Sequence, residues 1–213
     1  MPGYRGKRLL DLVLVVGSAP VWLLALGLVA WQVRRRIGRP VLFRQRRVGA
    51  GEREFLMLKF RSMTEARDPQ GNLRPDAERL TEFGKRLRAT SLDELPELLN
   101  VLRGEMSLVG PRPLLPKYLP RYSAVHRRRH AVAPGLTGLA QVSGRNALTW
   151  TDKFDLDIHY VQECSLVNDL RILVRTLRAV LLRDGIAADG DATMPEFIGY
   201  EPTDGRKPPA PVK

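Results

Sequence analysis

The longest apolar stretch of the chain runs from Leu9 to Trp31 and carries a single charge, at Asp11. A straight helix over these 23 residues would cover roughly 30 Å, enough to cross the hydrocarbon core of a bilayer. Pro20 lies at the midpoint, where proline removes one helical hydrogen bond and clashes with the preceding turn. The pattern therefore predicts two apolar arms, each too short to span a membrane.

Basic residues flank this stretch on both sides. Arg5, Lys7 and Arg8 precede it, and Arg34, Arg35, Arg36 and Arg39 follow it. Lys and Arg near membrane segments favour the cytoplasmic side, so the charges predict that both ends of the stretch lie on that side. A re-entrant helix broken at Ser18 and Pro20 accounts for this, with the Ser18 hydroxyl satisfying backbone groups freed at the break. A kinked transmembrane helix and a buried helix of a soluble core are the alternatives, whereas a secretory signal does not fit.

The remaining pattern predicts a helix-rich α+β fold. Short strands are expected at 41–43 and 55–58 around Gly49-Ala50-Gly51, as a β-hairpin. Residues 64–79 are polar and predict a surface loop, and Leu92 to Leu102 has helical spacing. Further helices are expected at 114–133 (short and interfacial), at 152–162 and, amphipathic, at 169–183.

We expect three parts along the chain. Residues 1–36 form the membrane helix, 37–183 a cytoplasmic or interfacial catalytic domain, and 184–213 a tail rich in Gly and Pro that is partly disordered.

Charge and composition restrict the partners. The net charge is +12, from 35 basic against 23 acidic residues, and residues 34–61 supply much of it. This favours an anionic membrane, phosphorylated substrates or nucleic acid, although a compositional bias toward arginine is an equal explanation for its excess. The one cysteine, Cys164, excludes a disulfide scaffold and a cysteine-built zinc site within the chain.

The candidate chemistry centres on Asp93 and Glu94, two adjacent carboxylates that precede an apolar helix. The structural alternative is a capping box, with Ser91 at the N-cap and Glu94 three residues later. The functional interpretation is that an ionised Asp attacks phosphorus or ligates Mg²⁺. Lys85, Arg86, Arg88, Arg103 and Arg112 surround the pair in sequence.

Two arginines in stiff or glycine-flanked turns are candidate phosphate ligands: Arg112 between two prolines, and Arg145 after Gly144. Asp155, Asp157 and Glu163 more often belong to a solvated helix face. His126, His130 and His159 show no pattern that demands zinc.

Seven motifs in order resemble the bacterial sugar transferases, which are monotopic polyprenyl-phosphate phosphoglycosyl transferases. They are Lys7-Arg8-Leu9-Leu10-Asp11, Leu58-Lys59-Phe60-Arg61-Ser62-Met63, Ser91-Leu92-Asp93-Glu94-Leu95-Pro96, Ser107-Leu108-Val109-Gly110-Pro111-Arg112-Pro113, Pro134-Gly135-Leu136-Thr137-Gly138, Gln141-Val142-Ser143-Gly144-Arg145 and Asp157-Ile158-His159-Tyr160-Val161. The resemblance covers about residues 5–183.

The resemblance implies a reaction and a set of roles. Sugar-1-phosphate passes from a UDP-sugar to undecaprenyl phosphate, giving UMP and a polyprenyl-diphosphate sugar, as the first membrane step of glycan assembly. Asp93 is the implied nucleophile and Mg²⁺ ligand, with Glu94 as its partner. Lys59, Arg88, Arg112 and Arg145 are the implied phosphate ligands. The implied location is the cytoplasmic face of the bacterial inner membrane, among membrane lipids.

The rival interpretations are a membrane-tethered basic protein that binds nucleic acid or one that binds only lipid, both without catalysis. Nucleic acid is not expected as a partner, because aromatic residues make up only 7% of the chain and no binding motif is present. The sequence leaves open the sugar, the glycan pathway, the role of the tail and the oligomeric state, a homodimer included.

Overall fold

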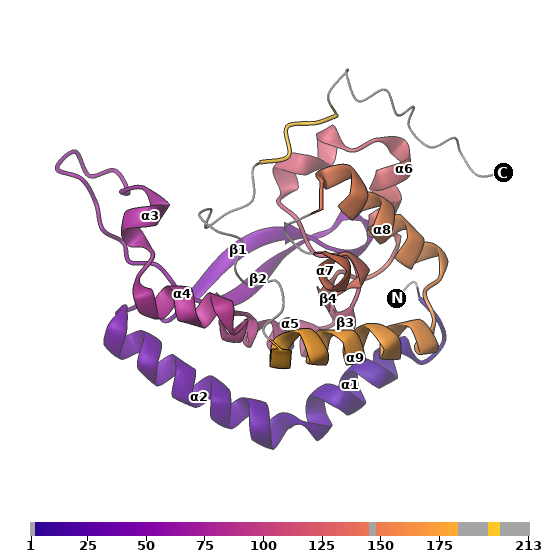
Figure 1. The fold of residues 1–213 in the computed structure, drawn as a ribbon, viewed down its shortest axis with the longest axis horizontal. Coiled ribbons are helices and arrows are strands. Elements are labelled where there is room, and N and C mark those ends of the chain that lie inside the picture. Colours follow the sequence, from indigo (N-terminus) through magenta and orange to yellow (C-terminus); the bar gives the residue numbers. More distant parts are fainter. Residues whose placement is uncertain (1–2, 145–147, 183–195, 201–213) are drawn as a thin grey trace.

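The computed structural model describes residues 3–144, 148–182 and 196–200 (Figure 1). Within these residues the chain is helix-rich α+β, as predicted. It contains two small two-stranded sheets, of which the antiparallel hairpin was predicted and the short parallel pair was not. The elements are α1 (Lys7–Gly17), α2 (Ala19–Arg36), β1 (Leu42–Val48), the 3₁₀ turn η1 (Ala50–Glu52), β2 (Glu54–Phe60), α3 (Asp76–Arg79), α4 (Glu82–Ala89), the 3₁₀ turn η2 (Leu92–Glu94), α5 (Glu97–Arg103), β3 (Ser107–Val109), the 3₁₀ turn η3 (Pro116–Arg121), α6 (Ala124–Arg127), the 3₁₀ turn η4 (Arg128–Ala131), β4 (Gly135–Thr137), α7 (Leu139–Ser143), α8 (Trp150–Gln162) and α9 (Leu166–Leu182).

The apolar N-terminal stretch is broken at the predicted place. α1 and α2 are bent by 64° about Ser18, and they form the open V at the bottom of Figure 1. The Ser18 hydroxyl donates to the Leu14 carbonyl oxygen at 2.6 Å, and the Trp22 indole donates to the Val15 carbonyl oxygen at 2.8 Å. The Leu14 carbonyl oxygen also accepts from the backbone N–H of Ser18 at 3.1 Å. The Trp22 indole thus supplies a donor to the Val15 carbonyl oxygen at the break.

By length and hydropathy, α1 and α2 together could span a membrane, although neither helix alone could. Among the described residues, no single helix is long and apolar enough to cross a membrane, whereas α1 and α2 taken together pass that test.

Polar side chains of α1 attach it to the rest of the fold. Lys7, only 5% exposed, donates to the Asp169 carboxylate of α9 at 2.6 Å. Arg8 donates to two carbonyl oxygens near the end of α5. Asp11 accepts from the Ser107 hydroxyl at 3.1 Å and from the next backbone N–H at 3.0 Å. Lys7 is therefore a buried partner of Asp169 and not a charge available to lipid headgroups.

The predicted hairpin is confirmed and is longer than the sequence pattern indicated. β1 and β2 pair antiparallel from Leu42 opposite Phe60 to Val48 opposite Glu54. Phe60 packs with Val29 and Val33 of α2. The open end of the hairpin thus lies on α2, and its tip, η1, lies against η4 at the other end of the hairpin.

The segment 114–133 does not form the predicted interfacial helix. It folds as η3, α6 and η4, and its apolar residues Leu114 and Tyr122 pack against Phe154 of α8 and Phe197. Aromatic side chains from α8 and from the described piece of the tail therefore cover the face that was expected to meet lipid.

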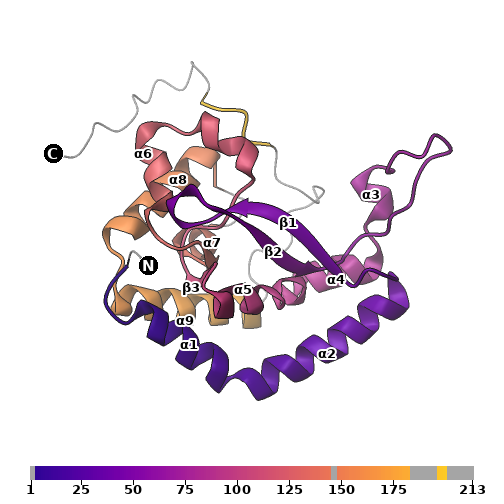
Figure 2. The ribbon, with the colours of Figure 1, turned by 180° about the vertical axis from the view of Figure 1, so that it is seen from behind.

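The last helix leaves an apolar face uncovered. α9 begins at Leu166, earlier than predicted, and buries Asp169 and Ile172. It lies beside α1 in both views (Figure 1 and Figure 2). Its exposed apolar side chains are Leu166, Val167, Leu170, Val174, Leu177 and Val180.

Candidate active site

Asp93 and Glu94 lie in η2, a 3₁₀ turn between α4 and α5. Ser91 adopts a left-handed conformation with φ 56° and makes no side-chain cap hydrogen bond. Pro96 is the N-cap of α5, which begins only at Glu97. The capping box and the continuous helix from Leu92 are therefore wrong. Pro96 has no backbone N–H to give to a helix that begins at Leu92, and the carboxylate that would close the box is bound to Lys59 and Arg112 instead.

The Glu94 carboxylate joins two of the predicted phosphate ligands. Its Oε1 accepts from Lys59 Nζ at 2.7 Å and from Arg112 Nη2 at 2.6 Å. Lys59 comes from β2 and Arg112 from the turn after β3. Burial opposes ionisation of Glu94, but Arg112 and Lys59 outweigh it and lower the pKa. Three sequence-distant segments thus meet at one ionised carboxylate.

Asp93 is the buried and unpaired member of the dyad. Its side chain makes no hydrogen bond or ion pair with any described residue, and the residue is 8% exposed. Burial and the neighbouring Glu94 raise its pKa to about 6, against the opposing effect of Lys59, Arg112 and Arg88. A desolvated carboxylate without a donor is a stronger nucleophile than a solvated one.

The structure brings Arg88 to the site but leaves Arg145 untested. Arg88 lies on α4, donates to the Ser62 hydroxyl at 2.9 Å, and acts electrostatically on Asp93. Arg145 lies outside the described residues.

Sequence reasoning missed Glu97, which lies under the site and is 2% exposed. Its carboxylate is 3.2 Å from Lys59 Nζ, so the lysine bridges Glu94 and Glu97. Burial and then Glu94 raise the pKa of Glu97. The available signal was an acidic residue on the buried side of an otherwise apolar helical run, three positions after Glu94.

A buried ion pair holds the turn that carries Arg112. Arg129 donates to the Arg112 carbonyl oxygen at 2.7 Å and twice to the Asp157 carboxylate, at 2.9 and 2.7 Å. The turn leaves β3 through Gly110, where a Cβ would lie 2.3 Å from a backbone carbonyl oxygen. The expectation that Asp157 is a solvated helix residue is therefore wrong, since it is 3% exposed and paired.

The residues present fit Mg²⁺ only as a site shared with a phosphorylated ligand. Within the described ranges, no cluster of three His, Cys, Asp or Glu side chains could hold a metal. Mg²⁺ is commonly bound through one or two carboxylates plus substrate phosphates. Among the described residues nothing bonds to the Asp93 oxygens, which are available to a cation, whereas Glu94 is already bonded to Lys59 and Arg112.

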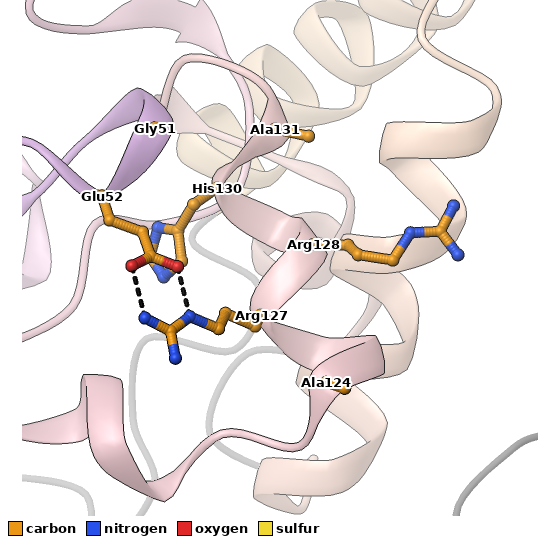
Figure 3. Close-up of a pocket in the computed structure, with 7 residues that line it drawn as sticks. All are labelled: Gly51, Glu52, Ala124, Arg127, Arg128, His130 and Ala131. Atoms are coloured by element: carbon orange, nitrogen blue, oxygen red, sulfur yellow. Dashed lines mark hydrogen bonds and ion pairs between the residues drawn. The ribbon is translucent and has the colours of Figure 1, made fainter. Parts of the chain in front are cut away.

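A separate hollow between the hairpin tip and α6 includes none of the predicted site residues. Figure 3 shows that Arg127 donates two hydrogen bonds to the Glu52 carboxylate, which links the hairpin tip to α6. Glu52, the one carboxylate among the residues that line this hollow, is thus paired with Arg127. Asp93 and Glu94 therefore remain the better candidates for catalysis.

Comparison with known proteins identifies the family. The description "bacterial sugar transferase" belongs to the family model that matches residues 3–183. The uncharacterized sugar transferase EpsL of Bacillus subtilis is 48% identical over 193 residues, which are 91% of this chain and 96% of EpsL. The UDP-glucose:undecaprenyl-phosphate glucose-1-phosphate transferase of Caulobacter vibrioides is 42% identical over 84% of this chain and 70% of that protein.

The galactosyl transferase CpsE of Streptococcus agalactiae is 40% identical over 84% of this chain, which spans only 43% of CpsE. The match to the family model extends from α1 through α9 and includes the dyad and its cations. The chain belongs to the bacterial sugar transferase family.

Proposed function

We propose that this chain transfers sugar-1-phosphate from a UDP-sugar to undecaprenyl phosphate, giving UMP and an undecaprenyl-diphosphate sugar. Relatives with this chemistry in their names, such as the transferase of Caulobacter vibrioides, support the proposal. The observation that carries it is the buried Asp93 carboxylate, which pairs with no residue that the structure describes and lies beside the Lys59–Glu94–Arg112 cluster. This arrangement supplies a nucleophile and cations for a phosphorylated substrate.

The proposed mechanism has two displacements at the sugar-linked phosphorus. An Asp93 oxygen forms a bond to that phosphorus, and the bond to the nucleoside phosphate breaks, with its electron pair leaving on UMP. An undecaprenyl phosphate oxygen then attacks the same phosphorus and releases the Asp93 carboxylate. Lys59, Arg88 and Arg112 offset the charge of the phosphates. Bound Mg²⁺, held by Asp93 and the substrate phosphates, would add further charge neutralisation.

The direct test is to incubate the purified chain with UDP-sugars and undecaprenyl phosphate and to assay UMP. We expect UMP release with at least one donor, and a mass increase equal to one phosphosugar after rapid quenching with donor alone. The non-catalytic alternatives predict neither product.

We further propose that α1 and α2 dip into one leaflet and return, which makes the protein monotopic, with the site on the cytoplasmic face of the bacterial inner membrane. The 64° bend and the exposed apolar side chains of α1, α2 and α9 support this arrangement. Residues 1–36 would then be the membrane part and 37–183 the catalytic part. The lipid-linked acceptor and the water-soluble donor can meet at such a boundary.

Cysteine labelling tests the topology. In a Cys164→Ser background, the single replacements Arg5→Cys and Ile37→Cys should react with a membrane-impermeant maleimide from the same side of the membrane. Both should be protected in sealed right-side-out vesicles and labelled in inverted ones. Labelling from opposite sides would show that the pair spans the bilayer.

The fall of activity at acid pH should reflect protonation of the Asp93 carboxylate. Its pKa is raised from the ordinary value to about 6, and only the ionised form attacks. The rate of UMP release should therefore fall as the pH drops through about 6. A cation beside a carboxylate favours ionisation, so raising Mg²⁺ from limiting to saturating should move this limb to lower pH. A rate that stays constant down to pH 4.5 at limiting Mg²⁺ would contradict the assignment.

A further inference from the structure

Arg47 of β1 is a half-buried guanidinium at the edge of the candidate site. Its Nη1 donates to the Pro113 carbonyl oxygen at 3.4 Å, and its Nη2 donates to the Gln45 amide oxygen at 2.7 Å. Pro113 directly follows Arg112, and the backbone N–H of Val48 donates to the carbonyl of Leu114 at 3.0 Å. The end of β1 is therefore fastened to the turn that carries Arg112.

No carboxylate of the described residues lies within ion-pair distance of Arg47. Arg112 has Glu94, and the deeply buried Arg129 has Asp157, whereas Arg47 makes no ion pair within the described ranges and its buried Nε has no hydrogen-bond partner there. Burial, and then the neighbouring Arg112, lower its pKa to about 10. Glu97 and Glu94 oppose this shift from a distance without outweighing it. A half-buried guanidinium that has no bonded carboxylate is stabilised by an added anion.

The position of Arg47 indicates which substrate supplies that anion. At its open end, β1 contacts α2 through Leu42. Arg47 lies five residues further along the strand, opposite Phe55 and next to the last residue before the hairpin turn. In the proposed arrangement, with α1 and α2 in the leaflet, a lipid-linked acceptor would reach the site along these helices. We therefore assign the end of the hairpin that carries Arg47 to the water-soluble donor.

We propose that Arg47 binds, together with Arg112, the nucleoside-side phosphate of the donor, the group that leaves as UMP. This inference rests on the proposed function. When the bond between the two phosphates breaks, its electron pair passes to the oxygen of the leaving phosphate. A guanidinium within hydrogen-bonding reach of that oxygen stabilises the added charge, while Lys59 and Glu94 remain beside the sugar-linked phosphate.

The test measures donor and acceptor separately with Arg47→Gln, Arg47→Lys and the control Arg46→Gln. Arg46 is on the same strand, its side chain is 77% exposed, and alternation along the strand points it to the other face. Arg47→Gln should raise the KM for the UDP-sugar by about 10- to 100-fold, as loss of a hydrogen bond to a charged group implies. The KM for undecaprenyl phosphate should stay within about twofold. Arg47→Lys should fall between, and Arg46→Gln should match the wild type.

Calorimetric titration with UDP provides a second readout that does not depend on turnover or on the sugar. UDP should bind Arg47→Gln at least about tenfold more weakly than wild type or Arg46→Gln. A purely structural role for Arg47 predicts a lower melting temperature and kcat with unchanged UDP affinity and donor KM, and that result would overturn the proposal. A rise confined to the acceptor KM would overturn it as well.

The inference and the proposed function fail in different ways. If the wild-type chain released no UMP, the proposed function would fail, and UDP titration of the three variants would still decide the role of Arg47. If wild type is active and Arg47→Gln binds UDP normally, only the Arg47 assignment is wrong.

Discussion

Replacement of Asp93 by Asn should abolish UMP release and the phosphosugar adduct. The amide keeps the shape of the side chain but has no carboxylate oxygen with which to form the acyl phosphate. Loss of an essential nucleophile typically reduces turnover on the order of 10⁴-fold or more. The measurements are UMP release with both substrates and intact-protein mass after quenching with donor alone.

The same variant should remain folded, which separates chemistry from stability. The Asp93 side chain makes no contact with a hydrogen-bond donor among the described residues, and burial disfavours its charged form. A neutral Asn should therefore leave the melting temperature unchanged or slightly higher. Asp76→Asn, the same chemical change at an exposed site on α3, is the matched control and should retain activity. Turnover of Asp93→Asn near the wild-type rate would remove the nucleophile assignment.

Chelation of Mg²⁺ should also stop the reaction, and added MgCl₂ should restore it. The residues around Asp93 supply cations for the phosphates, but Lys59 and Arg112 each already form an ion pair with Glu94. Part of the substrate charge is thus left for a divalent cation to offset. Activity that persists in excess EDTA would show that the reaction needs no such cation.

The melting temperature distinguishes a substrate-linked metal from a structural one. Because no three-ligand cluster is present in the described part of the chain, EDTA should leave the melting temperature unchanged. Mg²⁺ binding should strengthen when UDP is present, since the phosphates complete the coordination. A large drop in melting temperature on chelation would instead indicate a metal that supports the fold.

Features that depend on local sequence were predictable. The break at Ser18 and Pro20 follows from the chemistry of proline in a helix, and the Ser18 hydroxyl bonds within its own turn. The hairpin follows from two apolar runs around a glycine-containing turn. The adjacent pair Asp93-Glu94 and the motif that contains Lys59 were visible without any fold.

Features that depend on contacts between segments distant in the sequence could not be predicted. The capping box at Ser91 failed because Glu94 bonds to Lys59 and Arg112, which lie 35 and 18 positions away. Local propensity describes only the free energy of the turn itself, and two charge-assisted hydrogen bonds outweigh one cap.

The sequence by itself determined that an apolar arm, a hairpin and an acidic dyad flanked by cations exist. The resemblance already implied Lys59, Arg88 and Arg112 as ligands near the dyad, whereas only the tertiary structure added Arg47 and Glu97. Arg47 and Arg112 meet because β1 is hydrogen-bonded to the turn after β3, and Glu97 joins them by lying under Lys59. The physical reason is that charge interactions depend on separation and burial in space, and neither is a property of spacing along the chain.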